Sequence, residues 1–255
     1  MRQIATKRRL AAGEPSYGVG MLWPAPELVE LCGHLGFDWL WLDLEHGAFD
    51  LQALTQVVRA AEATGMDTIG RVSHTRDRDQ ILRYLETGLS GIIFPHVTSA
   101  EDVRFAVDAV KYPPIGSRSA GLFRPGGWGP GARPGRYYDD ANSQTIVMAL
   151  IEEEEGVENL DEILSVEGLD AAVIGFGDLS LTMGHPGAKD HPDVQRVGGG
   201  GQERILASDV ALQVTVQDGG EAKEWIDRGA LMVRCSLQQV LAPALREWLV
   251  SAGKA

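Results

Sequence analysis

The feature of this sequence that most constrains its fold is an eightfold alternation of short apolar runs with segments of helical periodicity. Each apolar run ends in polar residues, and a stretch with apolar residues at helical spacing follows it. The runs that we predict to be strands cover residues 17–22, 37–44, 67–72, 91–97, 145–151, 171–175, 211–216 and 230–235. Because parallel strands are joined by crossovers that are usually helical, this order predicts an α/β protein whose parallel sheet is covered by helices.

Segment 50–64 is the clearest predicted helix, because its apolar residues share one face and Gly65 follows as a stop signal. That face comprises Leu51, Leu54, Val57, Val58 and Ala61. Eight strand and helix units in 255 residues predict a single (β/α)8 TIM barrel domain over residues 1–255. The alternative is an open, doubly wound sheet with a dinucleotide site. It is disfavoured because Ser180 stands where the third glycine of that motif belongs after Gly175-Phe176-Gly177.

Composition argues against several classes of function. The chain has 36 acidic residues against 23 Lys and Arg, and its formal net charge of -13 repels a phosphate backbone, so no nucleic acid partner is expected. Apolar runs such as residues 146–151 are far shorter than the roughly 20 residues that span a bilayer, so no membrane partner is expected. Two cysteines without metal-type spacing and no secretory signal predict a cytoplasmic protein.

Barrel active sites form at the carboxyl ends of the strands, so the residues that follow each apolar run are the candidate site. Polar residues stand at most of these positions, although they are far apart in the sequence. They include Asp43, Glu45, His46, Arg71, His96, Glu152, Asp178, Gln217, Arg234 and Ser236. In a closed barrel these side chains share one opening.

Glu152 and Asp178 are the candidate metal ligands. They follow neighbouring strands, and two carboxylates can hold a hard divalent cation while water and substrate complete its coordination. Each has a structural alternative. Glu152 begins an acidic run that suits the start of a helix, and Asp178 can cap the turn that follows it. Their position at strand ends favours the ligand interpretation.

Arg71 and His46 are candidates for substrate binding and proton transfer. An arginine at a strand end offers a planar fork for a carboxylate or an enolate oxygen, with a structural ion pair as the alternative. The imidazole of His46 can exchange protons near neutral pH, although a lone histidine is as often structural. The other histidines receive no role: His34, His74, His96, His185 and His191.

Residues 113–143 separate the fourth helix from the fifth strand and are rich in Gly, Pro and Arg. This composition predicts a long loop. Such a loop in a compact domain is usually a lid, a binding loop or a subunit contact, with disorder as the alternative. Arg118 and Arg124 within it are candidates for recognising a carboxylate or a phosphate.

Several phrases of the sequence form a joint pattern that covers nearly the whole chain. They are Gly36-Phe37-Asp38-Trp39, Asp43-Leu44-Glu45-His46-Gly47, Arg71-Val72, Gly91-Ile92-Ile93-Phe94-Pro95, Tyr112-Pro113-Pro114-Ile115-Gly116-Ser117-Arg118-Ser119, Ile151-Glu152 and Gly175-Phe176-Gly177-Asp178-Leu179-Ser180. Together they resemble the HpcH/HpaI aldolase family of metal-dependent 2-oxo acid aldolases. That family includes 4-hydroxy-2-oxoheptanedioate aldolase and 2-dehydro-3-deoxyglucarate aldolase.

The resemblance implies a barrel in which Glu152 and Asp178 bind Mg, Mn or Co. Pyruvate would chelate that metal through its carboxylate and keto oxygens. Arg71 would hold the keto or enolate oxygen, and His46 would transfer protons through a water on the metal. Gly177 and Asp178 would offer backbone N–H groups to the pyruvate carboxylate.

The resemblance also implies that Trp23 lines the site and that residues 237–250, the last helix, are exchanged with a neighbouring subunit of a homohexamer. Glu86 stands where many relatives have Asp, so its carboxylate reaches one methylene further. Its implied partner is a histidine of a neighbouring subunit. Leu150 and Phe176 are further departures, at positions where many relatives have Gln and Pro.

The expected reaction is reversible aldol cleavage of a 4-hydroxy-2-oxo acid to pyruvate, or hydroxypyruvate, and an aldehyde. The other way to stabilise the carbanion is a lysine Schiff base, but none of the five lysines ends a predicted strand. One alternative function is a CoA-ester lyase of the citrate or malyl type, for which only the arginines of 113–136 offer a phosphate site. Another is a non-catalytic barrel that binds 2-oxo acids.

Overall fold

The computed structural model describes residues 2–129 and 134–254, which form a closed barrel of eight parallel strands. The strands pair in sequence order, and β8 closes on β1. Their bounds are β1 Ser16–Met21, β2 Trp39–Asp43, β3 Asp67–Arg71, β4 Gly91–Phe94, β5 Ile146–Ile151, β6 Ala171–Ile174, β7 Ala211–Thr215 and β8 Met232–Ser236. The TIM barrel predicted from the sequence is confirmed, and every predicted strand overlaps an observed one.

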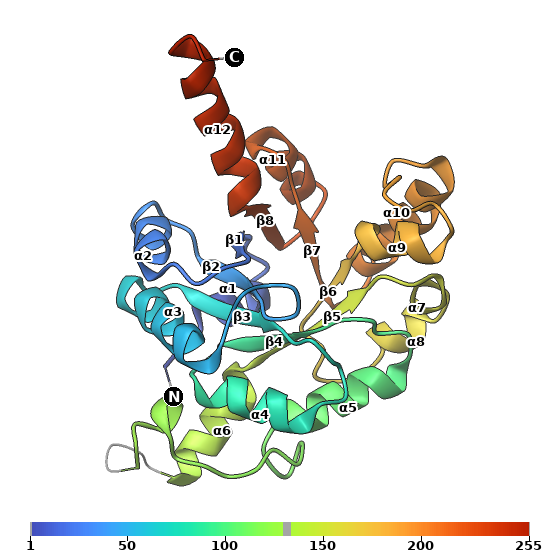
Figure 1. Cartoon of the computed structure of the whole chain (residues 1–255). Coiled ribbons are helices and arrows are strands. Elements are labelled where there is room, and N and C mark those ends of the chain that lie inside the picture. The colour runs from blue at the N-terminus through green and yellow to red at the C-terminus, as the bar shows by residue number, and fades with distance from the viewer. Residues whose placement is uncertain (1, 130–133, 255) are drawn as a thin grey trace.

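Helices surround the barrel (Figure 1). Those of the first half are α1 Ala5–Ala11, α2 Pro26–His34, α3 Leu51–Thr64, α4 Arg78–Glu86, α5 Ala100–Val110 and α6 Pro134–Gln144. Those of the second half are α7 Glu154–Glu158, α8 Leu160–Leu164, α9 Phe176–Thr182, α10 Pro192–Leu206, α11 Gly219–Asp227 and α12 Leu237–Ser251. Among the described residues, none of the helices combines the length and the apolar character needed to cross a bilayer.

Helix α3 begins and ends where its sequence signals stand. The Asp50 side chain accepts a hydrogen bond from the backbone N–H of Ala53 at 2.7 Å, which satisfies one of the free donors at a helix start. Gly65 ends the helix with φ at 84°, a left-handed conformation that favours glycine. The predicted helix over 50–64 is confirmed.

Strand side chains alternate between two cores. Trp39 and Trp41 of β2 point into the barrel, whereas Leu40 and Leu42 point outward to the helices. Ile4, from the segment before α1, joins the inner core. Side chains alternate along a strand with a period of two residues. The residue two positions after each inner apolar residue therefore also points into the barrel.

The amino end of the barrel is closed by paired charges. Asp67, at the start of β3, accepts hydrogen bonds from Arg2 at 2.6 Å and from the backbone N–H of Thr6 at 2.7 Å. Lys7 pairs with Asp170 just before β6. Lys111 is buried at the end of α5 and donates to the carbonyl oxygens of Asn142 at 2.7 Å and Thr145 at 2.6 Å.

The segment 113–143 is not a loop throughout. A 3-10 turn occupies Arg124–Gly126, helix α6 occupies Pro134–Gln144, and residues 130–133 lie outside the described residues. Tyr137 and Ala141 lie one turn apart on α6 and form a small buried cluster with Tyr112. Two buried apolar positions in a stretch of glycines and charges make the periodicity too weak to predict the helix.

The two candidate arginines of this segment lie away from the carboxyl ends of the strands. Arg118 pairs with Glu86, the last residue of α4, at 3.0 Å and stacks on Tyr112. Arg124 pairs with Glu62 and donates to the carbonyl oxygen of Thr87 at 2.9 Å. Both contacts are made at the carboxyl ends of helices, which lie at the amino end of the barrel.

Helix α12 extends away from the rest of the molecule (Figure 1). Only Leu237 of this helix is buried, and its large apolar side chains are exposed, with Trp248 at 68%. The other exposed ones are Val240, Leu245, Leu249 and Val250. Several exposed large apolar side chains on one helix favour an interaction site.

Candidate active site

A cavity of about 640 Å³ opens at the carboxyl ends of the strands. Asp43, Arg71 and Glu152 line it. Each lies two residues after an inner-core residue, Trp41, Ile69 and Leu150 respectively, so the same alternation that packs the core points these polar groups into the opening. The cavity therefore collects ionisable side chains that are far apart in the sequence.

Glu152 is the most deeply buried of the candidate ligands, at 2% exposure. Its Oε1 accepts a hydrogen bond of 3.0 Å from the backbone N–H of His96. Gly175 allows the carboxylate to lie where it does, because a Cβ there would lie 2.9 Å from Oε2. Burial, together with the nearby charge of Asp178, raises the pKa of Glu152 to about 7 against the opposing effects of His96 and Arg71.

Asp178 lies in the first turn of α9 and lines the same cavity. It does not cap that helix: the N-cap is Gly175, and no side chain caps it. Glu152 likewise stands before α7, which begins at Glu154. The capping alternative for Asp178 is therefore wrong, and Glu152 lies outside the helix that its acidic run precedes.

The donor set fits a hard divalent cation. Glu152 and Asp178 offer carboxylate oxygens that are near enough for one charge to shift the pKa of the other, and the cavity leaves space for water and substrate. Two like charges at a buried position are costly unless a cation lies between them.

Arg71 is held by two carboxylates. Its Nε and Nη2 bond to Asp43, with Nε at 3.2 Å from Oδ1, and its Nη1 lies 3.0 Å from Glu45. Burial lowers the pKa of Arg71, but the hydrogen bonds and charge of Asp43 outweigh this and raise it overall. The two hydrogen bonds to Asp43 use two of the five N–H donors of a guanidinium, so donors remain for a ligand.

His96 and Glu45 contact the candidate site residues Glu152 and Arg71, although neither has a predicted role. His96 has φ at 50°, rare for a residue other than glycine, and this conformation turns its N–H toward Glu152. Its Nε2 lies 3.7 Å from Glu45. The pair Pro95-His96 at a strand end was the available signal, but side-chain chemistry alone cannot reveal a role of the backbone N–H.

Three other candidates do not line the cavity. The side chain of His46 is 66% exposed, and its Nε2 lies 3.8 Å from Glu45. Trp23 packs partly buried against the outer core. Glu86 is at the opposite end of the barrel with Arg118. Gly177, in contrast, lies in the first turn of α9 on the cavity wall.

Lys189 also lines the cavity, because the loop between α9 and α10 carries it there. Lys189 does not follow a strand, so its place in the cavity could not be predicted from the strand ends. Its side chain is exposed, whereas a lysine that forms a Schiff base is activated by desolvation or a neighbouring cation. His185 and His191 of the same loop, with Asp193 in the first turn of α10, bring three possible metal ligands within 4.8 Å of one another, apart from Glu152 and Asp178.

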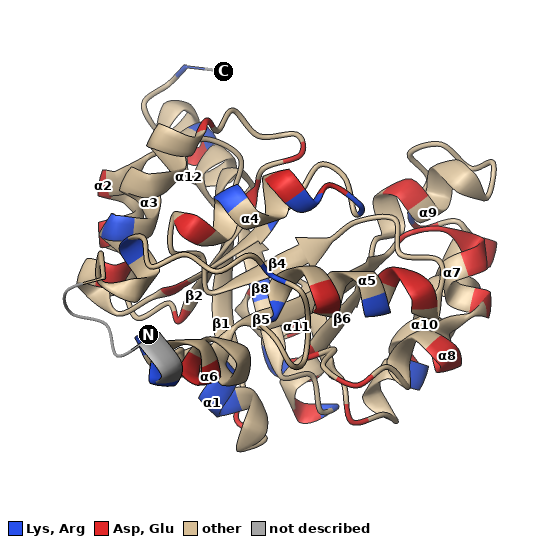
Figure 2. Cartoon of the chain, turned by 90° about the horizontal axis from the view of Figure 1, so that it is seen from below, with Lys and Arg blue, Asp and Glu red and all other residues tan. Residues whose placement is uncertain are grey.

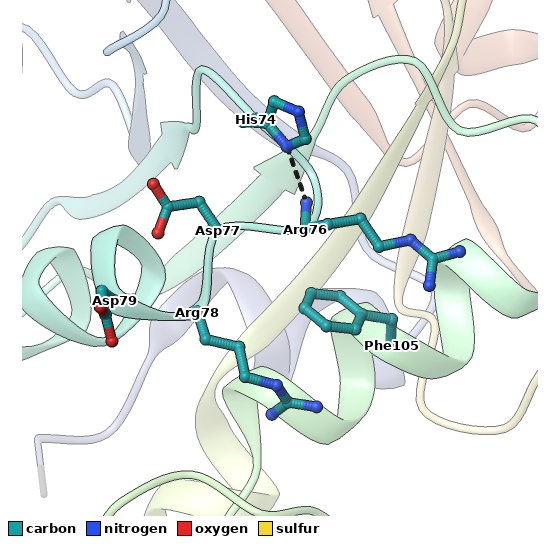
Figure 3. Close-up of a pocket in the computed structure, with 6 residues that line it drawn as sticks. All are labelled: His74, Arg76, Asp77, Arg78, Asp79 and Phe105. Carbon is teal, nitrogen blue, oxygen red and sulfur yellow. Dashed lines mark hydrogen bonds between the residues drawn. The ribbon is translucent and has the colours of Figure 1, made fainter.

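A second hollow lies beside the loop before α4 (Figure 3). Arg76 and Arg78 flank the ring of Phe105, at 5.3 and 4.6 Å from its centroid. Both guanidinium groups are already paired, Arg76 with Asp102 at 2.7 Å and Arg78 with Asp108. This hollow therefore has no free cation comparable to those of the barrel cavity.

The sequence matches the family model described as HpcH/HpaI aldolase/citrate lyase over residues 21–243. The chain belongs to this family. It is 33% identical over 237 residues to a 2-keto-3-deoxy-L-rhamnonate aldolase of Klebsiella pneumoniae, covering 92% of this chain and 87% of that protein. It is 35% identical over 245 residues to a hydroxypyruvate/pyruvate aldolase of Pseudomonas aeruginosa, covering 94% and 90%.

Solved structures of the family share the fold. A HpcH/HpaI aldolase/citrate lyase family protein from Burkholderia cenocepacia superposes with a TM-score of 0.90 at 27% identity, over 98% of this chain and 99% of that one. The family relationship predicted from the sequence phrases is thereby confirmed, and so is the barrel.

Proposed function

We propose that this protein is a metal-dependent aldolase that reversibly cleaves a 4-hydroxy-2-oxo acid to pyruvate, or hydroxypyruvate, and an aldehyde. The observation that carries the proposal is the meeting of Glu152, Asp178 and Arg71 in one cavity at the strand ends. The relatives named above are aldolases, which are carbon-carbon lyases. The proposal assigns the reaction to a single barrel domain.

Glu152 and Asp178 would hold a divalent ion, Mg, Mn or Co. When bound, such an ion supplies Lewis-acid polarisation of the keto oxygen of the 2-oxo acid. Gly177 and Asp178 lie in the first turn of α9, where backbone N–H groups have no acceptor within the helix, and these would bind the carboxylate of pyruvate.

Arg71 would donate free N–H groups to the keto oxygen as negative charge develops there. Asp43 and Glu45 hold the guanidinium in place, so it needs no reorganisation during the reaction. His46 is proposed to transfer the proton, since it is exposed at the rim and lies beside Glu45. Trp23 is proposed to contact substrate from the loop after β1.

We also propose a homohexamer in which α12 packs on a neighbouring subunit. The exposed apolar side chains of this helix, with Trp248 at 68%, support a protein partner. Glu86 would then approach a histidine of a neighbouring subunit, for which it would have to share or leave Arg118. A cytoplasmic location is proposed with it.

The alternative functions find less support. Figure 2 shows Lys and Arg scattered among Asp and Glu, and the basic residues Lys7 and Arg9 of α1 pair with Asp170 and Asp38. This distribution gives no footprint for nucleic acid. Arg118 and Arg124 lie at the amino end, so they offer no phosphate site for a CoA ester at the cavity. A non-catalytic binding barrel would bind pyruvate without exchanging its methyl protons.

The proposal is tested by incubating the protein with pyruvate, a panel of aldehydes, and Mg, Mn or Co. Aldol product and exchange of pyruvate methyl protons with solvent deuterium are expected, and both should disappear after thorough chelation and return with added metal. Turnover that survives complete chelation would refute it.

A further inference from the structure

The loop between α9 and α10 and the start of α10 carry metal-ligating side chains that the reaction described above does not use. His185, His191 and Asp193 each place one ligand atom within 4.8 Å of the others. Among the described residues, no other group of three or more His, Cys, Asp or Glu side chains meets this spacing. Two imidazoles and a carboxylate form a nitrogen-rich donor set, unlike the two carboxylates of Glu152 and Asp178.

The sequence of the loop restricts the positions of the two imidazoles. Each histidine precedes a proline, which disfavours the helical conformation of the residue before it: His185-Pro186 and His191-Pro192. The backbone N–H of Ala188 donates to the carbonyl oxygen of His185 at 3.0 Å, and the N–H of His191 donates to that of Ala188 at 3.0 Å. These two successive turns stack the rings, with their centroids 3.5 Å apart. The two imidazoles therefore lie together before any cation binds.

A structural role explains only one of the two histidines. The Nδ1 atom of His191 caps α10 by accepting a hydrogen bond of 3.3 Å from the backbone N–H of Asp193. The ring of His185 stacks on that of His191 and forms no hydrogen bond or ion pair with any described residue. A neutral imidazole has one nitrogen that accepts, so His185 keeps a free lone pair beside the other two ligand atoms.

We propose that His185, His191 and Asp193 form a second metal site, which binds a transition metal such as zinc. Imidazole nitrogen suits zinc and copper, whereas Mg and Mn prefer carboxylate oxygen and water. The two sites of the protein therefore select different cations. This inference goes beyond the proposed function and does not depend on it.

The geometry of the cluster is close to that of a zinc site. Zinc binds nitrogen and oxygen at about 2.0 to 2.2 Å, so two ligands of a tetrahedral site lie roughly 3.3 Å apart. Nδ1 of His191 lies 3.8 Å from Oδ2 of Asp193. Small side-chain rotations complete the site. The cation then replaces the N–H of Asp193 as the partner of Nδ1, and that N–H turns to water at the exposed start of the helix.

The second site bears on the barrel cavity through Lys189. This lysine lies between the two histidines in the sequence, and its side chain lines the cavity. Its Cε lies 3.8 Å from the place that a Cβ on Gly177 would take, so it lies beside the first turn of α9. A cation that joins residues 185 and 193 closes the segment between them and holds Lys189 at the cavity wall.

Zinc titration by calorimetry tests the site in Glu152→Gln, which lacks the other proposed ligand set. This variant is expected to bind one zinc ion per chain. Adding His185→Phe, which keeps an aromatic ring against His191, should lower the affinity at least by the roughly 10- to 100-fold that the loss of an outer-shell partner costs. Adding His34→Phe, at an exposed histidine of α2, should leave it unchanged. Equal affinity with and without His185→Phe would overturn the proposal.

Pulsed EPR of copper bound to Glu152→Gln identifies the ligand atoms without turnover. Coupling to imidazole nitrogen is expected, and it should be lost or reduced when His185→Phe is added. Coordination by oxygen alone would overturn the proposal.

Trypsin cleavage after the exposed Lys189 measures whether the cation fixes the loop. Zinc at about ten times its dissociation constant should slow this cleavage about tenfold in Glu152→Gln, because the protease cuts the open loop. No protection is expected when His185→Phe is added, which also controls for any effect of zinc on trypsin. Equal cleavage rates with and without zinc in Glu152→Gln would overturn the role of the site in holding Lys189.

Discussion

At the amino end of the barrel, Lys111 is buried and donates to two backbone carbonyl oxygens, and at the carboxyl end Glu152 is buried beside another carboxylate. Burial changes the pKa of both groups, lowering that of Lys111 to about 8 and raising that of Glu152 to about 7. The amino end matches its charges with protein partners, as Asp67 does with Arg2. At the carboxyl end Arg234 forms no ion pair with any described residue, and its Nε is buried without a hydrogen bond. A shifted pKa therefore does not by itself mark an active site; an unmatched group facing a cavity does.

Of the substitutions at the two ends of the barrel, Glu152→Gln is expected to have the largest effect on function. The variant should lose metal binding and at least about a thousandfold in turnover, because a neutral amide is a poor ligand for a hard cation. Metal content and the rate of aldol cleavage measure this. Asp178→Asn should behave in the same way, and normal turnover in both variants would refute the metal site.

The stability of Glu152→Gln supplies the internal control. The folded-state pKa of Glu152 is raised from 4.5 to about 7, so its ionisation costs stability as pH rises through this interval. Glutamine removes that cost. At pH 8 the metal-free variant should therefore melt at or above the temperature of the metal-free wild type, and a lower Tm would indicate that the side chain is structural.

Replacing Asp67 by Ala tests the opposite end. The change removes the charged partner of Arg2 and the acceptor of the Thr6 N–H, and it should lower the free energy of unfolding by about 3 kcal/mol. Denaturant titration measures the loss. The kcat of the folded variant should stay within twofold of the wild type. A larger loss of kcat would show that the amino end contributes to catalysis and would contradict the contrast between the two ends.

Lys111→Met tests whether a matched buried charge still titrates. The folded-state pKa of Lys111 is lowered from 10.5 to about 8, so the unfolded chain binds the extra proton and wild-type stability gains as pH rises between these values. From pH 8 to 10 this gain is roughly 2 kcal/mol relative to Lys111→Met. Parallel unfolding curves of both proteins at the two pH values would show it, and an equal pH dependence would contradict it.

The smallest expected effect is on metal affinity in the wild type. Glu152 must lose its proton to bind a cation, so each unit of pH below about 7 should weaken metal binding by up to about tenfold. Calorimetric titration with Mn between pH 5.5 and 8 checks this. Affinity that does not change over this range would mean that Glu152 is ionised throughout and would weaken the contrast with Lys111.

The sequence predicted the barrel and most of the cavity because both depend on short-range patterns. Strand alternation fixes which side each residue faces, so Arg71 and Glu152 could be assigned to the opening from the sequence alone. Three features were beyond this reasoning. They depend on tertiary contacts. They are the hydrogen bond from the backbone N–H of His96, the space that Gly20 leaves for the side chain of Arg234, and the position of Lys189 on a loop that lines the cavity. Helix α6 was not predicted because its apolar face is only two residues wide.

Because α12 extends away from the barrel, the specific activity of the protein is expected to depend on its concentration. The helix follows β8 directly, and Gln238 and Gln239 of its first turn form part of the cavity wall. If the exposed side of α12 is covered only when subunits associate, the shape of that wall depends on association. Specific activity would then fall when the protein is diluted below the dissociation constant of the assembly. A purification tag fused after residue 255 would lie near the subunit contact and would alter the activity by disturbing it.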